Sequence, residues 1–228
     1  MKINQDAINP LYYFDARLRR YRYRDTGKFL SKEAALNITR RYIEREKNNL
    51  IGLADKLESG EVDLFQFQLR ATEHLKHIHV SQGFLGSNGT ENMTSNDFLW
   101  IGRNLKKQYY SGIGEDGKRY GIQHLARELN AGTVTPAKLR QRLAMYADSG
   151  QAVYWQMRRE RATDKPYEYR QLDPGARHCQ SCINHAALGV KPIGVLPLPS
   201  EACTCYTRCR CSLIQITLEE AITKGIEL

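Results

Sequence analysis

The first 178 residues of this 228-residue chain contain no cysteine. The chain also has no apolar run long enough to span a membrane, so we expect no membrane association. Its opening residues, MKINQDAINPLYYF, lack the apolar core of a secretory signal. We therefore expect a soluble protein that folds in a reducing cytoplasm, where disulfides are rare.

Two motifs of zinc enzymes are also missing. The sequence has no HExxH motif, and no His-x-Glu pair precedes Cys179-x-x-Cys182 as it does in the zinc deaminases. A catalytic zinc ion needs an open coordination position and usually a general base beside it. We therefore predict that the protein is not an enzyme, that it has no catalytic residues, and that any bound metal is structural.

All six cysteines lie between Cys179 and Cys211. A Cys-x-x-Cys turn, followed about 20 residues later by a second group of cysteines, can supply four thiolates to one tetrahedral zinc ion. If the chain is extended around residue 210, the alternation of side chains places Cys209 and Cys211 on the same face. The predicted ligands of a structural zinc ion are therefore Cys179, Cys182, Cys209 and Cys211.

Other donors in the same stretch leave this ligand set open. Cys203 competes for one position, Cys205 is an additional thiol, and His178 and His185 are further donors. Disulfides are the competing interpretation of six cysteines, and they would suit a protein that is part of an extracellular particle. A reducing site of synthesis favours zinc.

Positive charge exceeds negative charge, with a formal net charge of +9. Such a balance favours nucleic acids or acidic protein surfaces as partners. The charge is densest in RLRRYRYR, where arginines can bind phosphates and tyrosines can stack on bases or anchor a protein interface. Because like charges repel, we expect this arm to be poorly ordered without a partner. The predicted DNA- or partner-binding residues are Arg17, Arg19, Arg20, Arg22 and Arg24.

Hydrophobic periodicity and capping residues predict about five helices after the arm. Ser31 is the expected N-cap of the first helix, in which Leu36, Ile43, Leu50 and Leu57 recur every seven residues. The predicted ranges are about 32–59, 64–81, 94–110, 120–130 and 136–162, the last with a kink at Ser149-Gly150.

The second predicted helix carries three histidines. His74 and His77 have the spacing to share a metal ion, but no carboxylate or cysteine nearby in the sequence completes such a site. We therefore interpret these two residues and His79 as surface histidines of an amphipathic helix. The residues expected to form its apolar side are Leu64, Phe65, Leu69, Leu75 and Ile78.

The composition changes near residue 165, from helical periodicity to a segment rich in Tyr, Pro, Gly and Cys. We predict a basic, aromatic arm at residues 1–30, a helical domain at 31–165 and a Cys-rich domain at 166–228. The expected fold is mainly α, with a helical amino-terminal region followed by a small lobe of turns and β-strands closed by a zinc site. So small a lobe has little apolar core of its own, and a structural metal can compensate for this.

Several motifs follow one another in an order that resembles a known family. They are YRYRDTGKFLS, the LESGEV turn, Leu172-Asp173-Pro174-Gly175, Cys179-x-x-Cys182, Gly189-x-x-Pro192-Ile193-Gly194, Leu196-Pro197 and Cys209-Arg210-Cys211. This order resembles the minor head proteins of tailed bacteriophages, the head-morphogenesis family that includes the Mu F-like proteins. The resemblance covers residues 170–213 well and the remainder loosely, and Cys205 departs from the family's pattern.

The resemblance implies a structural virion protein that is made in the cytoplasm of a host bacterium and located in the head and portal region of the particle. As part of a multi-subunit assembly, it would contact the portal or the major capsid protein, assist head morphogenesis and contact packaged double-stranded DNA without sequence specificity. The alternative function is a zinc-dependent nuclease or a phage-delivered effector enzyme. That alternative needs a cleft lined by catalytic side chains, for which Asp173, His178, His185 and Glu201 are the nearest candidates.

Overall fold

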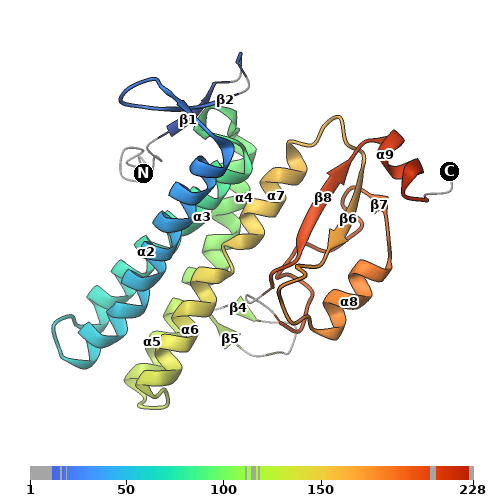
Figure 1. Ribbon diagram of the computed structural model, residues 1–228. Coiled ribbons are helices and arrows are strands. Elements are labelled where there is room, and N and C mark those ends of the chain that lie inside the picture. Colours follow the sequence, from blue (N-terminus) through green and yellow to red (C-terminus); the bar gives the residue numbers. More distant parts are fainter. Residues whose placement is uncertain are drawn as a thin grey trace. The chain divides into compact units, whose positions relative to one another are not determined.

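The computed structural model divides the chain into two compact units, Met1–Gly150 and Gln151–Leu228. Both units contain helices and short strands (Figure 1). All six cysteines belong to the second unit. The residues that the structure describes are 12–15, 17–18, 20–110, 112–113, 117, 119–205 and 209–225.

Five α-helices form most of the first unit. Four of them begin at the polar N-caps Ser31, Asp63, Thr94 and Thr135, whose side chains accept a hydrogen bond from the first turn of the helix. The helices are α2 (Lys32–Glu58), α3 (Leu64–Gly86), α4 (Ser95–Tyr109), α5 (Ile122–Asn130) and α6 (Pro136–Asp148). Their existence and most of their boundaries confirm the prediction from capping and periodicity.

Helix α2 packs against both α3 and α6, and α3 in turn packs against α4 and α5. The middle of its predicted apolar stripe, Leu50 with Leu53 and Ala54, is buried. The chain then turns and α3 runs back along α2 (Figure 1). On the opposite side of α2, Arg41 and Glu44 are exposed as expected of a charged face, whereas Glu46, expected on the same face, is buried.

Helix α3 differs from its prediction in length and in orientation. It continues to Gly86 rather than ending near Ser81, because Val80 and Phe84 are buried in the core, where the Phe84 ring meets Phe98 of α4 edge to face. Leu75 and Ile78 are buried as expected. Phe65 and Leu69 are instead 73% and 60% exposed, and the buried face of the first two turns carries Phe67 and Ala71.

The prediction of a poorly ordered arm is wrong for the described residues of the arm. They form a three-stranded antiparallel sheet. Its strands are β1 (Tyr12–Asp15), β2 (Arg20–Tyr23) and β3 (Phe29–Leu30). The physical reason is the alternation of tyrosine with arginine, which has the period of a strand and puts the two residue types on opposite faces. Tyr12, Tyr21 and Leu30 form a buried cluster against which Ala34 and Ile38 of α2 pack.

Three short elements complete the first unit. A 3-10 turn, η1 (Thr90–Asn92), precedes α4, and the strands β4 (Gly112–Ile113) and β5 (Arg119–Tyr120) pair in an antiparallel fashion after it.

Among the described residues, none of the helices combines the length and the apolar character needed to cross a membrane.

The second unit begins earlier than the domain boundary predicted near residue 165. Its first element is α7 (Gln151–Glu160), which is separated from α6 by the predicted break at Ser149-Gly150. Trp155 of α7 is buried in a cluster with Leu196, Leu198 and Leu213. The sequence prediction placed α7 in the helical domain because hydrophobic periodicity indicates that a segment is helical. It does not indicate which element the helix packs against.

A three-stranded antiparallel sheet with the order β7-β6-β8 forms the centre of the second unit. Its strands are β6 (Tyr167–Gln171), β7 (Lys191–Pro192) and β8 (Ser212–Ile216), accompanied by the helices α8 (Gln180–Ala187) and α9 (Leu218–Thr223). Glu168 and Arg170 alternate with Tyr167 and Tyr169 along β6, so both charged side chains lie on the buried face.

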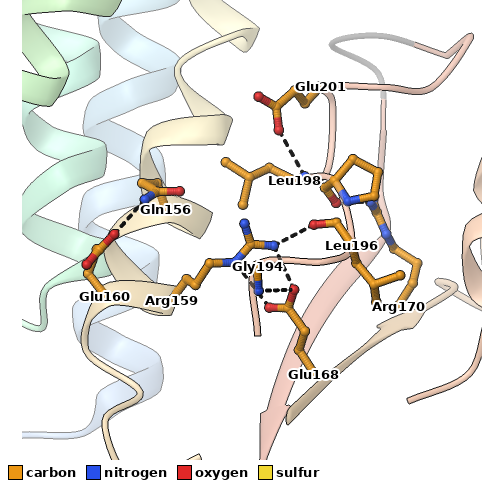
Figure 2. Close-up of polar contacts among 10 residues, drawn as sticks. Gln156, Arg159, Glu160, Glu168, Arg170, Gly194, Leu196, Leu198 and Glu201 are labelled. Atoms are coloured by element: carbon orange, nitrogen blue, oxygen red, sulfur yellow. Dashed lines mark hydrogen bonds and ion pairs between the residues drawn. The ribbon is translucent and has the colours of Figure 1, made fainter. Parts of the chain in front are cut away.

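Glu168 connects α7, β6 and the loop before β8 through a buried ion pair (Figure 2). Its carboxylate accepts hydrogen bonds from Arg159 Nε at 3.1 Å and Nη2 at 2.8 Å, and from the Gly194 N–H at 3.0 Å. Arg159 Nη2 also donates to the Leu196 carbonyl at 2.7 Å. Gly194 has a φ of 92°, a conformation that favours glycine, so this motif residue is suited to the turn that aims its N–H at Glu168.

Candidate metal centre

The six cysteines of the second unit gather in one cluster. Within the described residues they form two groups, and the sulfur atoms of each group lie within 4.8 Å of one another. The first group comprises Cys179, Cys182, Cys203 and Cys205, and the second comprises Cys182, Cys209 and Cys211. Cys182 belongs to both groups and is fully buried.

The separations between sulfur atoms fit metal coordination. Two thiolates bound to one tetrahedral zinc ion lie about 3.8 Å apart, because each Zn–S bond is about 2.3 Å long. Cys182 Sγ lies 3.7 Å from Cys209 Sγ and 3.5 Å from Cys205 Sγ, and Cys205 Sγ lies 3.3 Å from Cys203 Sγ. All six cysteines are reduced. The cluster therefore has the geometry to bind a metal.

The first pair of cysteines is positioned by the start of α8. Cys179 is the N-cap of this helix, and its Sγ accepts a hydrogen bond from the Cys182 N–H at 3.4 Å. A thiol is an unusual N-cap, and the partial positive charge of the helix end favours the thiolate form there. The short helix thus turns the Cys-x-x-Cys spacing into two sulfur atoms that face the same cluster.

The second pair precedes β8 directly. Cys209 and Cys211 lie before the first residue of the strand, Ser212, and both are buried. They meet Cys182, which agrees with the expectation that they share one face. The fourth predicted ligand, Cys179, groups instead with Cys203 and Cys205. Sequence spacing could not predict this division, because the path of the loop between the two cysteine pairs is set by tertiary packing.

Burial and hydrogen bonding move the thiol pKa values in opposite directions. Burial opposes ionisation of Cys179, but hydrogen bonds from the Thr204 side chain and the Cys182 N–H outweigh it and lower the pKa to about 5. Burial raises the pKa of Cys182 and, to about 11, that of Cys211. Cys179 therefore favours the thiolate form, whereas Cys182 and Cys211 disfavour it unless a cation is present.

The two histidines named from the sequence lie in different positions relative to the sulfur atoms. His178 Nδ1 lies 3.7 Å from Cys211 Sγ, and its Nε2 lies 2.7 Å from the Asp173 carbonyl oxygen. His185 Nε2 lies 2.8 Å from the Ala202 carbonyl oxygen, and His185 belongs to neither group of sulfur ligands. His178 also belongs to neither group, but of the two histidines it is the one whose ring contacts a cysteine sulfur.

The basic residues of the arm are divided between internal contacts and solvent. Arg22 contacts Asp15 at 3.0 Å and Arg24 contacts Glu91 at 3.1 Å, so both carry charge that a carboxylate of the same chain balances. Arg17 and Arg20 are exposed, and Arg20 lies over the ring of Phe29. Arg19 lies outside the described residues. The predicted role of these arginines in DNA or partner binding stays a prediction.

A carboxylate that the sequence did not reveal joins two of the α3 histidines. Glu46 of α2 lies 2.7 Å from His74 Nδ1 and 3.6 Å from His77 Nδ1. Burial raises the pKa of Glu46, but the hydrogen bonds from the two histidines outweigh burial and lower the pKa to about 2. Glu46 therefore completes the constellation that the sequence prediction lacked, and the ligand atoms of the three residues lie close enough together to hold a metal ion. Glu46 was missed because it is 28 residues from His74 along the chain.

His79 also departs from its interpretation as a surface histidine, since only 2% of its surface is exposed. It lies on the face of α3 that carries Leu75 and Ile78 into the core. Histidine spacing alone did not identify this face, because the apolar side of the helix was placed incorrectly at Phe65 and Leu69.

The fold and the site together define a class, a mainly helical protein with a small cysteine-rich unit that has the geometry of a metal site. Comparison of the chain with protein-family models, with curated proteins and with solved structures finds no significant match. The function must therefore be inferred from the residues themselves.

Proposed function

We propose that the protein is a structural component of a tailed-phage particle, a minor head protein whose carboxy-terminal unit is held together by zinc. The observation that carries the proposal is the use made of the residues that resemble the head-morphogenesis family. Asp173, Gly194, Leu196 and the cysteines among them contribute to building the second unit. A protein whose recognisable motif serves its own scaffold suits an assembly role better than a catalytic one.

The contacts of the motif residues support this step. The Asp173 side chain accepts a hydrogen bond from the Gly175 N–H at 2.9 Å and so forms the turn after β6, and its carbonyl accepts one from His178. Gly194 binds Glu168, and Leu196 is buried beside Trp155. The cysteines close the remaining side of the unit. On this assignment, these motif residues serve the scaffold of the unit.

A structural zinc site suits the thiolate-rich set of donors. Structural zinc is bound by four protein ligands, mainly cysteines, whereas catalytic zinc keeps one position for water. The first group of cysteines alone offers four sulfur donors to one metal ion. Zinc would then contribute folding free energy to the second unit and would not bind a substrate.

An exposed apolar pair on α3 supports a role in assembly. Phe65 and Leu69 are separated by one helical turn, so they share a face of the helix, and they are 73% and 60% exposed. Large exposed apolar side chains on a rigid helix are suited to a protein interface. We assign this pair to the contact with the portal or the capsid, and the exposed Arg17 and Arg20 to sequence-independent contact with packaged DNA.

Quantitative mass spectrometry of purified phage particles tests the proposal. The protein should be present in them in few copies, and the double variant Phe65→Ser/Leu69→Ser should reduce its incorporation by about tenfold or more, since each buried anchor contributes over 1 kcal/mol to an interface. The matched surface variant Arg17→Ala/Arg20→Ala should be incorporated normally. Absence of the wild-type protein from particles would overturn the proposal.

A further inference from the structure

The cysteine cluster has more donors than a single metal ion can use. Besides the six sulfur atoms of the two groups, His178 lies just outside the second group with its Nδ1 3.7 Å from Cys211 Sγ, which gives seven potential donors (six Cys and one His). A tetrahedral zinc ion takes four of them and would leave three beside it. The sulfur atoms that bind no metal would have to stay protonated as thiols, because thiolates this close together repel one another.

Cys182 allows all seven donors to be used. It is the only cysteine common to the two groups in the described part of the chain, and its sulfur lies between Cys205 and Cys209, at 3.5 and 3.7 Å. A thiolate has several lone pairs and can bind two metal ions at once. If Cys182 is counted twice, the donors number eight, which equals two complete sets of four.

We propose that the cluster binds two zinc ions that share the Cys182 thiolate. One ion is held by Cys179, Cys182, Cys203 and Cys205. The other is held by Cys182, Cys209, Cys211 and His178. This inference rests on the structural role that is proposed for zinc, and it replaces the single ion predicted from cysteine spacing.

The hydrogen bonding of His178 leaves its Nδ1 atom able to bind a metal ion. A carbonyl oxygen can only accept a hydrogen bond, so the 2.7 Å contact with Asp173 O places a proton on His178 Nε2. In the neutral ring Nδ1 then has a free lone pair, and this is the atom that faces Cys211. A backbone carbonyl that orients the distal nitrogen is a common second contact of histidines bound to zinc.

The charge balance also favours two ions. Six thiolates with one zinc ion would carry a net charge of −4, whereas two zinc ions reduce it to −2 (six negative charges against four positive ones). The guanidinium of Arg170 acts electrostatically on Cys211 and is 3% exposed, and its Nε and Nη1 atoms have no hydrogen-bond partner among the described residues. A cluster that remains negative provides this buried cation with a counter-charge.

The number of metal ions in the full-length protein provides the first test. Native mass spectrometry and elemental analysis of wild-type protein, purified under reducing conditions with zinc, should give two zinc ions per chain. After exchange with 113Cd, NMR should show two cadmium resonances that are coupled to each other through the shared sulfur. One ion per chain, or two resonances without coupling, would overturn the shared cluster.

Single substitutions assign the ligands to the two ions. Cys205→Ser should reduce the count from two to one and should leave the resonance of the ion that His178 binds. His178→Ala should shift or abolish that resonance instead, whereas the matched control His185→Ala should change neither the count nor the spectrum. An effect of His185→Ala equal to that of His178→Ala would contradict the assignment.

The count also separates this inference from the proposed function. A single zinc ion with a folded second unit would refute the two-ion cluster and leave the structural role of zinc intact. A folded second unit without any metal would refute both.

Discussion

His79 lies inside the helical unit with only 2% of its surface exposed, and desolvation lowers its pKa to about 4. In the unfolded chain the pKa of histidine is about 6.5. Between these two values the unfolded chain binds more protons than the folded protein does. The contribution of neutral His79 to stability is therefore complete above pH 6.5 and is lost as the pH falls towards 4.

We predict that the first unit loses roughly 3 kcal/mol of its free energy of unfolding between pH 6.5 and pH 4 through this one residue. Urea denaturation at several pH values, followed by circular dichroism, would measure the loss. The variant His79→Leu should show a smaller slope over the same range, since leucine cannot take up a proton. An unchanged slope in this variant would assign the acid sensitivity to other groups.

At the residue scale, the sequence identified the cysteines but not the contacts between them. Confinement of all six to one segment, in two short groups, was sufficient to predict a metal-binding geometry, because such groups can supply four thiolates to one ion. The division into two groups around Cys182 depends on the path of the loop from Gly189 to Cys203. Glu46 was missed for a similar reason, since it lies on α2 and its partners lie on α3.

At the element scale, helices were predictable where a cap and a periodic stripe coincided. Ser31 caps its helix as expected, and Asp63, Thr94 and Thr135 cap theirs in the same way, because side-chain capping is a local interaction. Tertiary packing determined the helix ends and strands that local sequence signals did not predict. Helix α3 extends to Gly86 because its last turns are buried, and the basic arm forms strands because Tyr12 and Tyr21 are buried on α2. Periodicity within a segment shows neither the burial of the last turns of α3 nor the packing of Tyr12 and Tyr21 against α2.

Glu168 and Arg159 show how one ion pair can join two elements. The carboxylate of Glu168 is fully enclosed, and 13% of the Arg159 side chain is exposed. The pair fixes α7 to β6, so that removal of one partner leaves an uncompensated charge in the core of the second unit. Figure 2 also shows Gln156 and Glu160, which make an exposed contact of 2.7 Å on α7.

We predict that Arg159→Met destabilises the second unit by about 3–5 kcal/mol, because the Glu168 carboxylate would remain buried without its cation. Thermal or denaturant unfolding would measure the loss. The control Glu160→Gln, on the same helix, should change stability by less than about 1 kcal/mol, since its contact is exposed to solvent. Equal effects of the two substitutions would show that the buried pair does not join α7 to the sheet.

At the scale of the whole molecule, the two units obtain their stability from different sources. The first buries apolar residues from several helices, such as Phe67, Leu75 and Leu143. The second has a small core, formed by Trp155 with three leucines, and a cluster of cysteines beside it. A unit of this size has little apolar area to bury, so a metal would contribute a large share of its stability.

The last prediction follows from this difference. Removal of metal by a strong zinc chelator, under reducing conditions, should unfold the second unit while the helices of the first remain folded, because a structural metal stabilises only the segment that it closes. Amide hydrogen exchange would measure this directly. Protection in β6 and β8 should fall by at least about tenfold, and protection in α2 and α3 should be unchanged. Cys182→Ser should reproduce the effect without chelator, and return of zinc to the treated wild-type protein should restore protection. If β6 and β8 remain protected after the metal is removed, apolar burial and the Arg159–Glu168 pair are sufficient to hold the second unit, and metal is not part of its fold.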